Sequence, residues 1–254
     1  MRTIILQNVS SKEIREVSKA IALFDKDDYE LIRLDISELK QHRKELIYGA
    51  VPVGSVEFCR EAMKVVGIRE PYINSYPNIS WIPYYRIISK LPVSVVLDLV
   101  TDKKFIKPTK VKRFNGFVYD RKIPVMELDD YTKEQVKVLL TLPDNEEIWL
   151  SDVVDFLSEF RYYIDNGEIV GFARYDDSEE EGDHLIPDLT VVKNFASKLS
   201  KSHPYVLDFG VLSSGETALV EYNAFYAIGL YPDAITAKKY LELLVKYWDH
   251  IRSI

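Results

Sequence analysis

Cysteine is almost absent from this sequence. Cys59 is the only cysteine among 254 residues, so no disulfide can form within the chain. This scarcity is typical of proteins kept in a reducing cytoplasm. Cys59 lies in Val-Glu-Phe-Cys-Arg-Glu-Ala-Met, a segment with helical character. A buried structural thiol is favoured there over a catalytic nucleophile.

Long apolar runs, internal repeats and low-complexity tracts are also missing. No stretch approaches the roughly 18 unbroken apolar residues of a membrane span. The first residues, Met-Arg-Thr-Ile-Ile-Leu-Gln-Asn, lack the apolar core and the cleavage site of a secretory leader. We therefore expect a cytoplasmic protein without a membrane partner. The histidines are scattered without metal-ligand spacing, at His42, His184, His203 and His250.

The sequence has no excess of positive charge. The formal net charge is −7 at pH 7, which argues against a nucleic-acid partner, although a local basic cleft is compatible with it. Hydrophobic residues make up 47% of the chain and charged residues 29%. This composition suits one large core or two or three small lobes, and it does not define an oligomeric state.

The first 80 residues alternate strands and helices. Strands are expected at 3–7, 29–34 and 48–53, and helices from Ser10 or Ser11 to about Phe24, at 38–45 and from Ser55 to about Val66. This alternation predicts a small open α/β lobe. The Gly54-Ser55 junction has two interpretations, an anion site on free N–H groups or a tight turn with a serine cap.

Strands dominate the remainder after a proline-containing connection at 67–83. The sequence predicts a short helix at 84–90, a helix or strand at 93–99, and strands at 104–108, 114–119 and 148–154. Hairpins are expected at 159–175, across Asn166-Gly167, and at 205–222. Helices follow at 189–200 and 234–251. The acidic segment 176–183 is a solvated loop or, alternatively, a metal site.

Three oxygen-bearing side chains are the most informative residues. Asp208 interrupts an apolar strand, and Glu221 and Asn223 are two apart on the next strand, so they share a face. A hairpin would bring Asp208 beside them. Two carboxylates and an amide oxygen suit Mg²⁺. The alternative is a hydrogen-bonded polar pair at a sheet edge.

Two lysines and one apolar strand add a second group of candidates. Lys107 lies in the apolar strand Phe-Ile-Lys-Pro and Lys112 follows it, so both could reach phosphate oxygens or be surface lysines. The segment from Ile148 to Arg161 is an apolar strand followed by carboxylates. Its backbone could bind an adenine edge, and a carboxylate beyond it could bind ribose hydroxyls.

The order of these motifs resembles the ATP-grasp superfamily. The motifs are Phe-Ile-Lys-Pro, an apolar hinge strand, Glu-Phe-Arg, Leu-Asp-Phe-Gly and Val-Glu-Tyr-Asn, and the segment Glu-Tyr-Asn-Ala-Phe-Tyr-Ala-Ile-Gly-Leu-Tyr is similar to the ending of compact phage and bacterial members. The resemblance covers about residues 80–254. It implies a mixed α/β (α+β) fold, with an N-terminal lobe at 1–80 and an ATP-grasp domain at 81–254. Subdomains at about 81–154 and 155–254 would hold ATP between them.

The resemblance also implies roles for individual residues. ATP would be held by a set of residues in the linker and the central strands, namely Arg86, Lys107, Lys112, Asp152, Val153, Val154 and Glu159. Mg²⁺ would be held by Asp208, Glu221 and Asn223. Arg161 and Arg174 would stabilise the transferred phosphoryl group. The glycine-rich loop of larger relatives is missing, and the segment 109–116 is short.

The reaction implied by the resemblance is ATP-dependent formation of an amide. A small-molecule or peptide carboxylate would become an acyl phosphate, and an amine acceptor would then displace phosphate. A kinase on the same scaffold would instead phosphorylate a hydroxyl. A non-catalytic nucleotide-binding or interaction module would bind ATP without turnover.

Overall fold

The N-terminal lobe is a small parallel sheet with helices on it. The computed structural model describes residues 1–22, 28–79, 83–110, 113–178 and 180–254. The strand order is β2–β1–β3, from β1 (Arg2–Gln7), β2 (Tyr29–Leu34) and β3 (Val51–Val53). Its helices are α1 (Lys12–Ile21), α2 (Arg43–Ile47) and α3 (Val56–Val66). Ser11 and Ser55 cap α1 and α3, which confirms the predicted helix starts.

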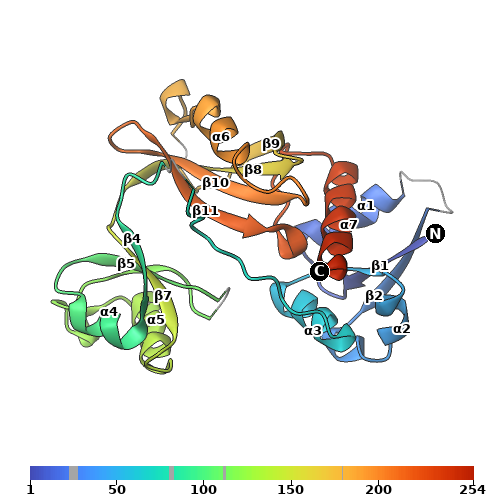
Figure 1. Cartoon of the computed structure of the whole chain (residues 1–254), viewed down its shortest axis with the longest axis horizontal. Helices are drawn as coiled ribbons and strands as arrows, with labels where there is room; N and C mark the ends of the chain where they lie inside the picture. The colour runs from blue at the N-terminus through green and yellow to red at the C-terminus, as the bar shows by residue number, and fades with distance from the viewer. Residues whose placement is uncertain (23–27, 80–82, 111–112, 179) are drawn as a thin grey trace.

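A second body is built on an antiparallel sheet. Its strand order is β4–β7–β5–β6, from β4 (Ile88–Pro92), β5 (Lys104–Pro108), β6 (Phe117–Tyr119) and β7 (Glu147–Ser151). Helices α4 (Val93–Leu99) and α5 (Asp130–Leu140) accompany it. Its core is separate from the others and includes Val96, Ile106 and Leu139. This sheet therefore forms its own packing unit, seen at one end of Figure 1.

The third sheet consists of two hairpins side by side. Its order is β11–β10–β8–β9, from β8 (Phe156–Asp165), β9 (Glu168–Arg174), β10 (Tyr205–Leu212) and β11 (Thr217–Ala224). Asn166 and Gly167 have φ angles of 54° and 81°, which confirms the turn expected between β8 and β9. Helices α6 (Leu189–Ala196) and α7 (Ala237–Ser253) complete the body.

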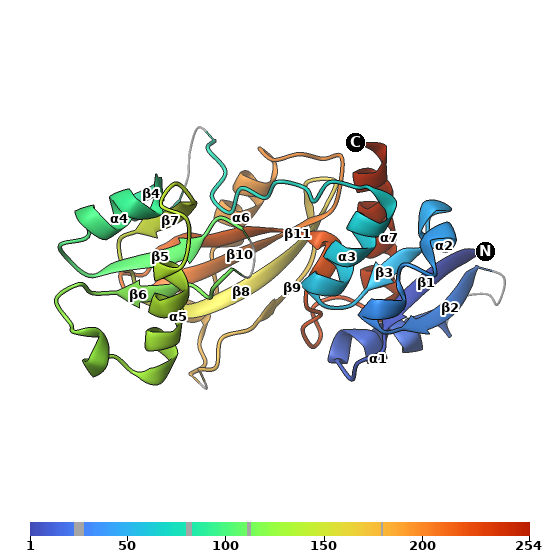
Figure 2. The ribbon, with the colours of Figure 1, turned by 90° about the horizontal axis from the view of Figure 1, so that it is seen from below.

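The N-terminal lobe and the third sheet share one hydrophobic core. Ile4 of β1, Tyr163 of β8 and Trp248 of α7 belong to the same cluster of buried residues. Figures 1 and 2 show α7 beside α1 and α3, with the β4–β7 sheet at the opposite end of the molecule. Two of the three bodies are thus joined by packing, and the third faces them. Within the part of the chain that the structure describes, no helix combines the length and apolarity needed to cross a membrane.

Several local predictions were wrong. The segment expected to be helical at 84–90 contains no helix: residues 84–87 are irregular, with Tyr85 at a φ of 51°, and residues 88–90 belong to β4, which pairs with β7 in the register Ile88↔Ser151. Helix α5 was not predicted, although Asp129 caps it by accepting from the Thr132 N–H group. Strand β7 ends at Ser151, three residues before the expected end. The expected helix end near Phe24 and the boundary near residue 80 lie outside the described residues, so both stay predictions.

Candidate nucleotide-binding site

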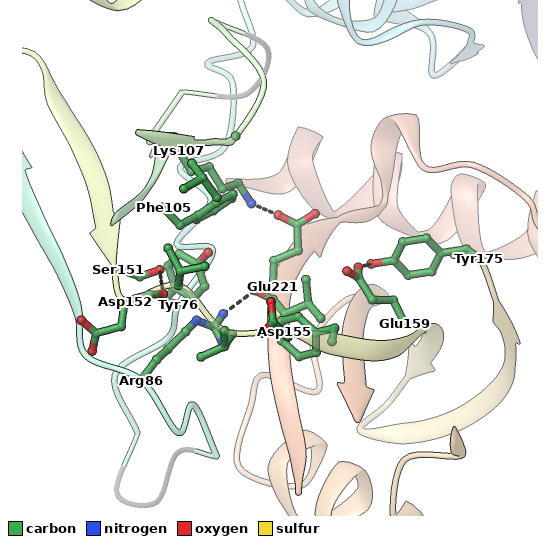
Figure 3. A pocket seen from close by; sticks show the side chains of 16 residues that line it. Tyr76, Arg86, Phe105, Lys107, Ser151, Asp152, Asp155, Glu159, Tyr175 and Glu221 are labelled. Carbon is green, nitrogen blue, oxygen red and sulfur yellow. Dashed lines mark hydrogen bonds and ion pairs between the residues drawn. The ribbon is translucent and has the colours of Figure 1, made fainter. Parts of the chain in front are cut away.

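A cavity of about 510 Å³ lies between the two antiparallel sheets. Strands β5, β6 and β7 form one wall, and β8 and β11 form the other (Figure 3). The lining residues are Tyr76, Arg86, Phe105, Lys107, Gly116, Val118, Ser151, Asp152, Val153, Val154, Asp155, Phe156, Glu159, Tyr175, Val220 and Glu221. The volume is within the range of small-molecule sites, roughly 300–1,000 Å³.

Lys107 projects from β5 across the gap between the sheets. Its ammonium forms an ion pair with Glu221 of β11, which Figure 3 shows on the facing wall. It also lies 5.7 Å from the centre of the Tyr76 ring. Burial lowers the pKa of Lys107 to about 8, although the charge of Asp208 acts in the opposite direction. Lys107 is therefore a half-buried cation, and its ion pair, among the residues that the structure describes, is with a carboxylate of the opposite lobe.

The predicted oxygen cluster forms at the edge of this cavity, where Glu221 lines it and Asp208 and Asn223 lie beside Glu221. Asp208 and Glu221 are direct cross-strand partners, and a bulge follows between Asp208 and Phe209. The Asn223 side-chain N–H group donates to Glu221 Oε1 at 2.8 Å and to Asp208 Oδ2 at 3.1 Å. The three side chains thus converge beside Lys107, as the hairpin pattern predicted. Among the described residues, no group of three or more His, Cys, Asp or Glu could hold a metal.

Arg161 neutralises the buried member of the cluster. Its Nε and Nη2 donate to the two oxygens of Asp208 at 2.9 and 2.7 Å, and Asp208 is fully buried. The guanidinium carbon lies 5.5 and 5.2 Å from the ring centres of Tyr175 and Tyr231. Burial disfavours the charged guanidinium, but the charge and hydrogen bonds of Asp208, together with nearby tyrosines, outweigh it and raise the pKa of Arg161. Arg161 is thus a fixed, permanently charged group next to the cluster.

Glu159 lies on the same face of β8 as Arg161, two residues earlier. Its Oε2 accepts a hydrogen bond from the Tyr175 hydroxyl at 2.5 Å, and both residues line the cavity (Figure 3). Burial raises the pKa of Glu159, while the hydrogen bond from Tyr175 acts in the opposite direction. A half-buried carboxylate with acceptor capacity to spare suits a ligand that offers hydroxyl groups.

The segment after β7 lines the cavity, but the Asp152 carboxylate is bound elsewhere. The Asp152 carboxylate accepts from Lys104 Nζ at 2.5 Å and from the Ile87 N–H group at 3.0 Å. The pKa of Asp152 is lowered by Lys104. Figure 3 shows this side chain pointing away from the cavity. Val153 and Val154 line the cavity beyond the strand and make no backbone hydrogen bond to another described residue.

Arg86 enters the cavity from the connection between the lobes. It was expected on a helix, but it lies at a bend in the irregular residues before β4. Its guanidinium donates to the carbonyl oxygens of Tyr84 at 3.1 Å and Val220 at 3.3 Å. It lies 5.7 Å from the ring centre of Tyr76. Among the described residues Arg86 has no carboxylate partner, so its charge is available to an anionic ligand.

Two predicted site residues are not placed at the cavity. Arg174 pairs in register with Phe160, whose side chain belongs to the core around α6 on the opposite face of the sheet. Its Nε donates to Asp176 Oδ2 at 2.7 Å. The neighbouring residue, Tyr175, faces the cavity instead, because side chains alternate along a strand. Lys112 lies outside the described residues, so its role stays a prediction.

Sequence reasoning missed several residues that line the cavity. Phe105 could have been found, because it shares a strand face with Lys107 two residues away. The glycine at position 116 is explained by the same ring, because a β-carbon there would lie 2.5 Å from Phe105. Tyr175 required the register of the hairpin. Tyr76 comes from the irregular connection, and no periodic signal marks it.

Two facing α+β lobes with a lysine, an amide and two carboxylates around a cavity define an ATP-grasp protein. A model of one family, the ATP-grasp domain of R2K clade family 2, matches residues 87–243. The chain belongs to this family. A search of curated proteins gave no match.

Several solved structures share the fold. D-alanine–D-alanine ligase from Bacillus anthracis, complexed with ATP, aligns with a TM-score of 0.55 and 16% identity over 100% of this chain and 98% of that one. N5-carboxyaminoimidazole ribonucleotide synthetase from Thermotoga maritima gives 0.56 and 11%, over 97% and 76%. The ATP-grasp ligase PsnB, complexed with a minimal precursor, gives 0.52 and 9%, over 97% and 99%. At these identities the likeness shows the fold, including its N-terminal lobe.

Proposed function

We propose that this protein is an ADP-forming ligase that uses Mg-ATP to join a carboxylate to an amine. The convergence of Lys107 with Asp208, Glu221 and Asn223 at one end of the cavity is the observation that carries this proposal. The family and the ligases among its structural neighbours support it. The proposal assigns ATP to the cavity between the sheets.

The nucleotide would lie along the cavity from its apolar end to its charged end. Adenine would lie against Phe105 and Val118, with its edge on the free backbone groups of Val153 and Val154. Glu159 would accept hydrogen bonds from the ribose hydroxyls. Further along, the cations Arg86 and Lys107 would bind the phosphates, since both line the cavity and Arg86 has no described carboxylate partner. The backbone of Asp152 belongs to the adenine end, while its side chain stabilises the sheet.

The oxygen cluster fits Mg²⁺ by the chemistry of its donors. Two carboxylates and an amide provide hard oxygen ligands, and few protein ligands suffice when phosphates and water complete the coordination. Mg²⁺ would supply charge neutralisation at the β- and γ-phosphates when bound. For this, Asn223 must turn its amide oxygen toward the ion, and Lys107 must exchange Glu221 for a phosphate. Both changes are side-chain rotations, so the backbone can stay fixed.

The proposed reaction needs positioning and charge stabilisation rather than a covalent nucleophile. An oxygen of the substrate carboxylate attacks the γ-phosphorus, the bond to the bridging oxygen breaks, and ADP leaves. The amine then attacks the acyl carbon, the bond to the phosphate oxygen breaks, and the amine loses a proton to solvent. Lys107 and Arg161 stabilise the negative charge on the transferred group. Arg161 is suited to this because Asp208 and two tyrosine rings fix its position.

ADP release tests the proposal when it is measured together with product masses. ATP and Mg²⁺ would be incubated with pooled carboxylates and amines, and new amides would be identified by mass spectrometry. We expect ADP formation that depends on both substrates. Transfer of phosphate to a hydroxyl compound would instead indicate a kinase, and ATP binding without ADP formation under any pool would indicate a binding module. Either result would overturn the ligase assignment.

A further inference from the structure

A tyrosine of the connection between the N-terminal lobe and β4 lines the nucleotide cavity. Tyr76 is only 7% exposed, although the described residues on either side of it form neither helix nor strand. In the view of Figure 3 it lies between Lys107 and Arg86. The connection therefore does more than join two lobes, because it adds a buried aromatic ring to the wall of the proposed site.

Contacts with both antiparallel sheets fix the position of Tyr76. Its ring makes a T-shaped contact with Trp149 of β7, with ring centres 5.0 Å apart, and a second one with Tyr84 at 5.8 Å. The preceding residue, Ser75, accepts a hydrogen bond from the Tyr222 N–H group of β11 at 2.9 Å. The backbone is thus tied to one wall of the cavity and the ring packs against the other, so the ring has little freedom to turn.

The Tyr76 ring lies beside both cations that we assign to the phosphates. Lys107 Nζ and the guanidinium carbon of Arg86 are each 5.7 Å from the ring centre. An aromatic ring attracts a cation over about 6 Å, and the attraction is stronger where water is excluded. Lys107 comes from β5 and Arg86 from the connection, so a single ring contacts two charges from different parts of the chain.

We propose that Tyr76 is a positioning residue that holds Lys107 and Arg86 where they receive the phosphates of ATP. The inference rests on the proposed function, since it concerns the same nucleotide site. Lys107 now pairs with Glu221, which must leave it to bind Mg²⁺. The ring does not have to move during this exchange. It therefore keeps the ammonium in the cavity while the carboxylate partner is lost.

The same connection contains a matched tyrosine outside the cavity. Lys90 Nζ lies 5.8 Å from the ring centre of Tyr72, almost the same distance as between Lys107 and Tyr76. Neither Tyr72 nor Lys90 lines the nucleotide cavity, and Tyr72 is 70% exposed. Tyr72→Leu therefore removes a similar contact between a tyrosine and a lysine without touching the proposed site, and it serves as the control.

Nucleotide binding by variants of Tyr76 tests the proposal. Calorimetry on the full chain would measure the affinity for a non-hydrolysable ATP analogue with Mg²⁺ in Tyr76→Phe, Tyr76→trifluorophenylalanine and Tyr76→Leu. Fluorine withdraws electrons from the ring and weakens its negative face while nearly keeping its shape. Tyr76→Leu would also be combined with Lys107→Met, because a double-mutant cycle shows whether two side chains act together. Thermal unfolding identifies the variants that fold, and the fluorinated ring provides the test if Tyr76→Leu does not.

We expect Tyr76→Phe to bind the analogue within ~3-fold of wild type, because phenylalanine keeps the ring face. The fluorinated variant should bind roughly 3–10-fold more weakly than Tyr76→Phe, and Tyr76→Leu roughly 5–30-fold more weakly than wild type. In the Lys107→Met background, Tyr76→Leu should cost at least ~3-fold less, because one of the two cations is already gone. Tyr72→Leu should bind like wild type.

Four outcomes would overturn the positioning role. They are unchanged affinity in Tyr76→Leu, equal affinity of the fluorinated variant and Tyr76→Phe, an equal loss in Tyr76→Phe and Tyr76→Leu, and a Tyr76→Leu loss of the same size with and without Lys107. The last would indicate packing alone.

The same measurements separate this role from the proposed function. Nucleotide binding that depends on Tyr76, without amide formation, would count against the ligase reaction alone. Amide formation with unchanged binding in Tyr76→Leu would count against the positioning role alone. A wild type that binds no ATP analogue would overturn both, because the nucleotide assignment itself would be wrong.

Discussion

Asp208→Asn and Glu221→Gln should both abolish magnesium-dependent turnover, but only the first should strongly destabilise the protein. Each substitution removes one carboxylate from the proposed metal site and keeps the shape of the side chain. The difference comes from what each carboxylate neutralises. Asp208 is fully buried against Arg161, whose side chain is 12% exposed. Glu221 pairs with Lys107, and these two side chains are 22% and 20% exposed.

The magnitudes follow from burial. Leaving a buried charge without its partner costs about 3–5 kcal/mol, so Asp208→Asn should lower the melting temperature by roughly 6–20 °C in a chain of this size. A partly exposed pair contributes about 1 kcal/mol or less, so Glu221→Gln should lower it by no more than roughly 4 °C. Loss of one group that stabilises the transferred charge reduces turnover about 100–1,000-fold. Glu221→Gln is therefore the cleaner test of the metal site.

Thermal unfolding by circular dichroism, without nucleotide, gives the stability difference, and ADP release at saturating Mg²⁺ gives turnover. Equal melting temperatures for the two variants would refute the claim that Asp208 is needed to neutralise Arg161. Wild-type turnover in Glu221→Gln would refute the metal assignment. Asn223→Asp provides a further check, because it keeps an oxygen ligand but removes the amide N–H group that now bridges the two carboxylates.

Three other perturbations have defined outcomes. Lys107→Met should weaken ATP binding about 10–100-fold by calorimetry. Lys90→Met, which removes a pair with Glu147 and a contact with the Tyr72 ring away from the cavity, should leave it unchanged. Burial raises the pKa of Glu159, so the native state holds this proton more tightly than the unfolded chain and loses stability on ionisation. Glu159→Gln should therefore have a higher melting temperature than wild type at neutral pH, and this gain should vanish below pH 4.5, the ordinary pKa of a glutamate. The same variant should bind ATP more weakly. A lower melting temperature at pH 7 would contradict the stability prediction. Arg174→Gln should retain ADP release within about 2-fold, because its side chain lies on the far face of the sheet; a loss comparable to that of Lys107→Met would place Arg174 in the site after all.

Local signals in the sequence were sufficient for much of the fold. Asn166-Gly167 specified the turn of the β8–β9 hairpin, because these residues adopt positive φ at low cost. Strand β10, Tyr205–Leu212, begins where the hairpin expected at 205–222 begins, in an apolar segment that Asp208 interrupts. The segment around Arg86 was predicted wrongly as a helix. The strand that follows it from Ile88 depends on pairing with β7, a partner some 60 residues away, and no local pattern encodes that pairing.

The sequence by itself determined which residue types could form a site and on which strand faces they lie. Alternation placed Glu221 with Asn223, and the order of motifs identified the ATP-grasp family. Only the tertiary structure decided which charges meet. Arg161 binds Asp208 of the neighbouring strand, and Arg174 faces away from its neighbour Tyr175. Strand register and the contact between lobes fix these distances, and both depend on packing between distant segments rather than on local conformational preference.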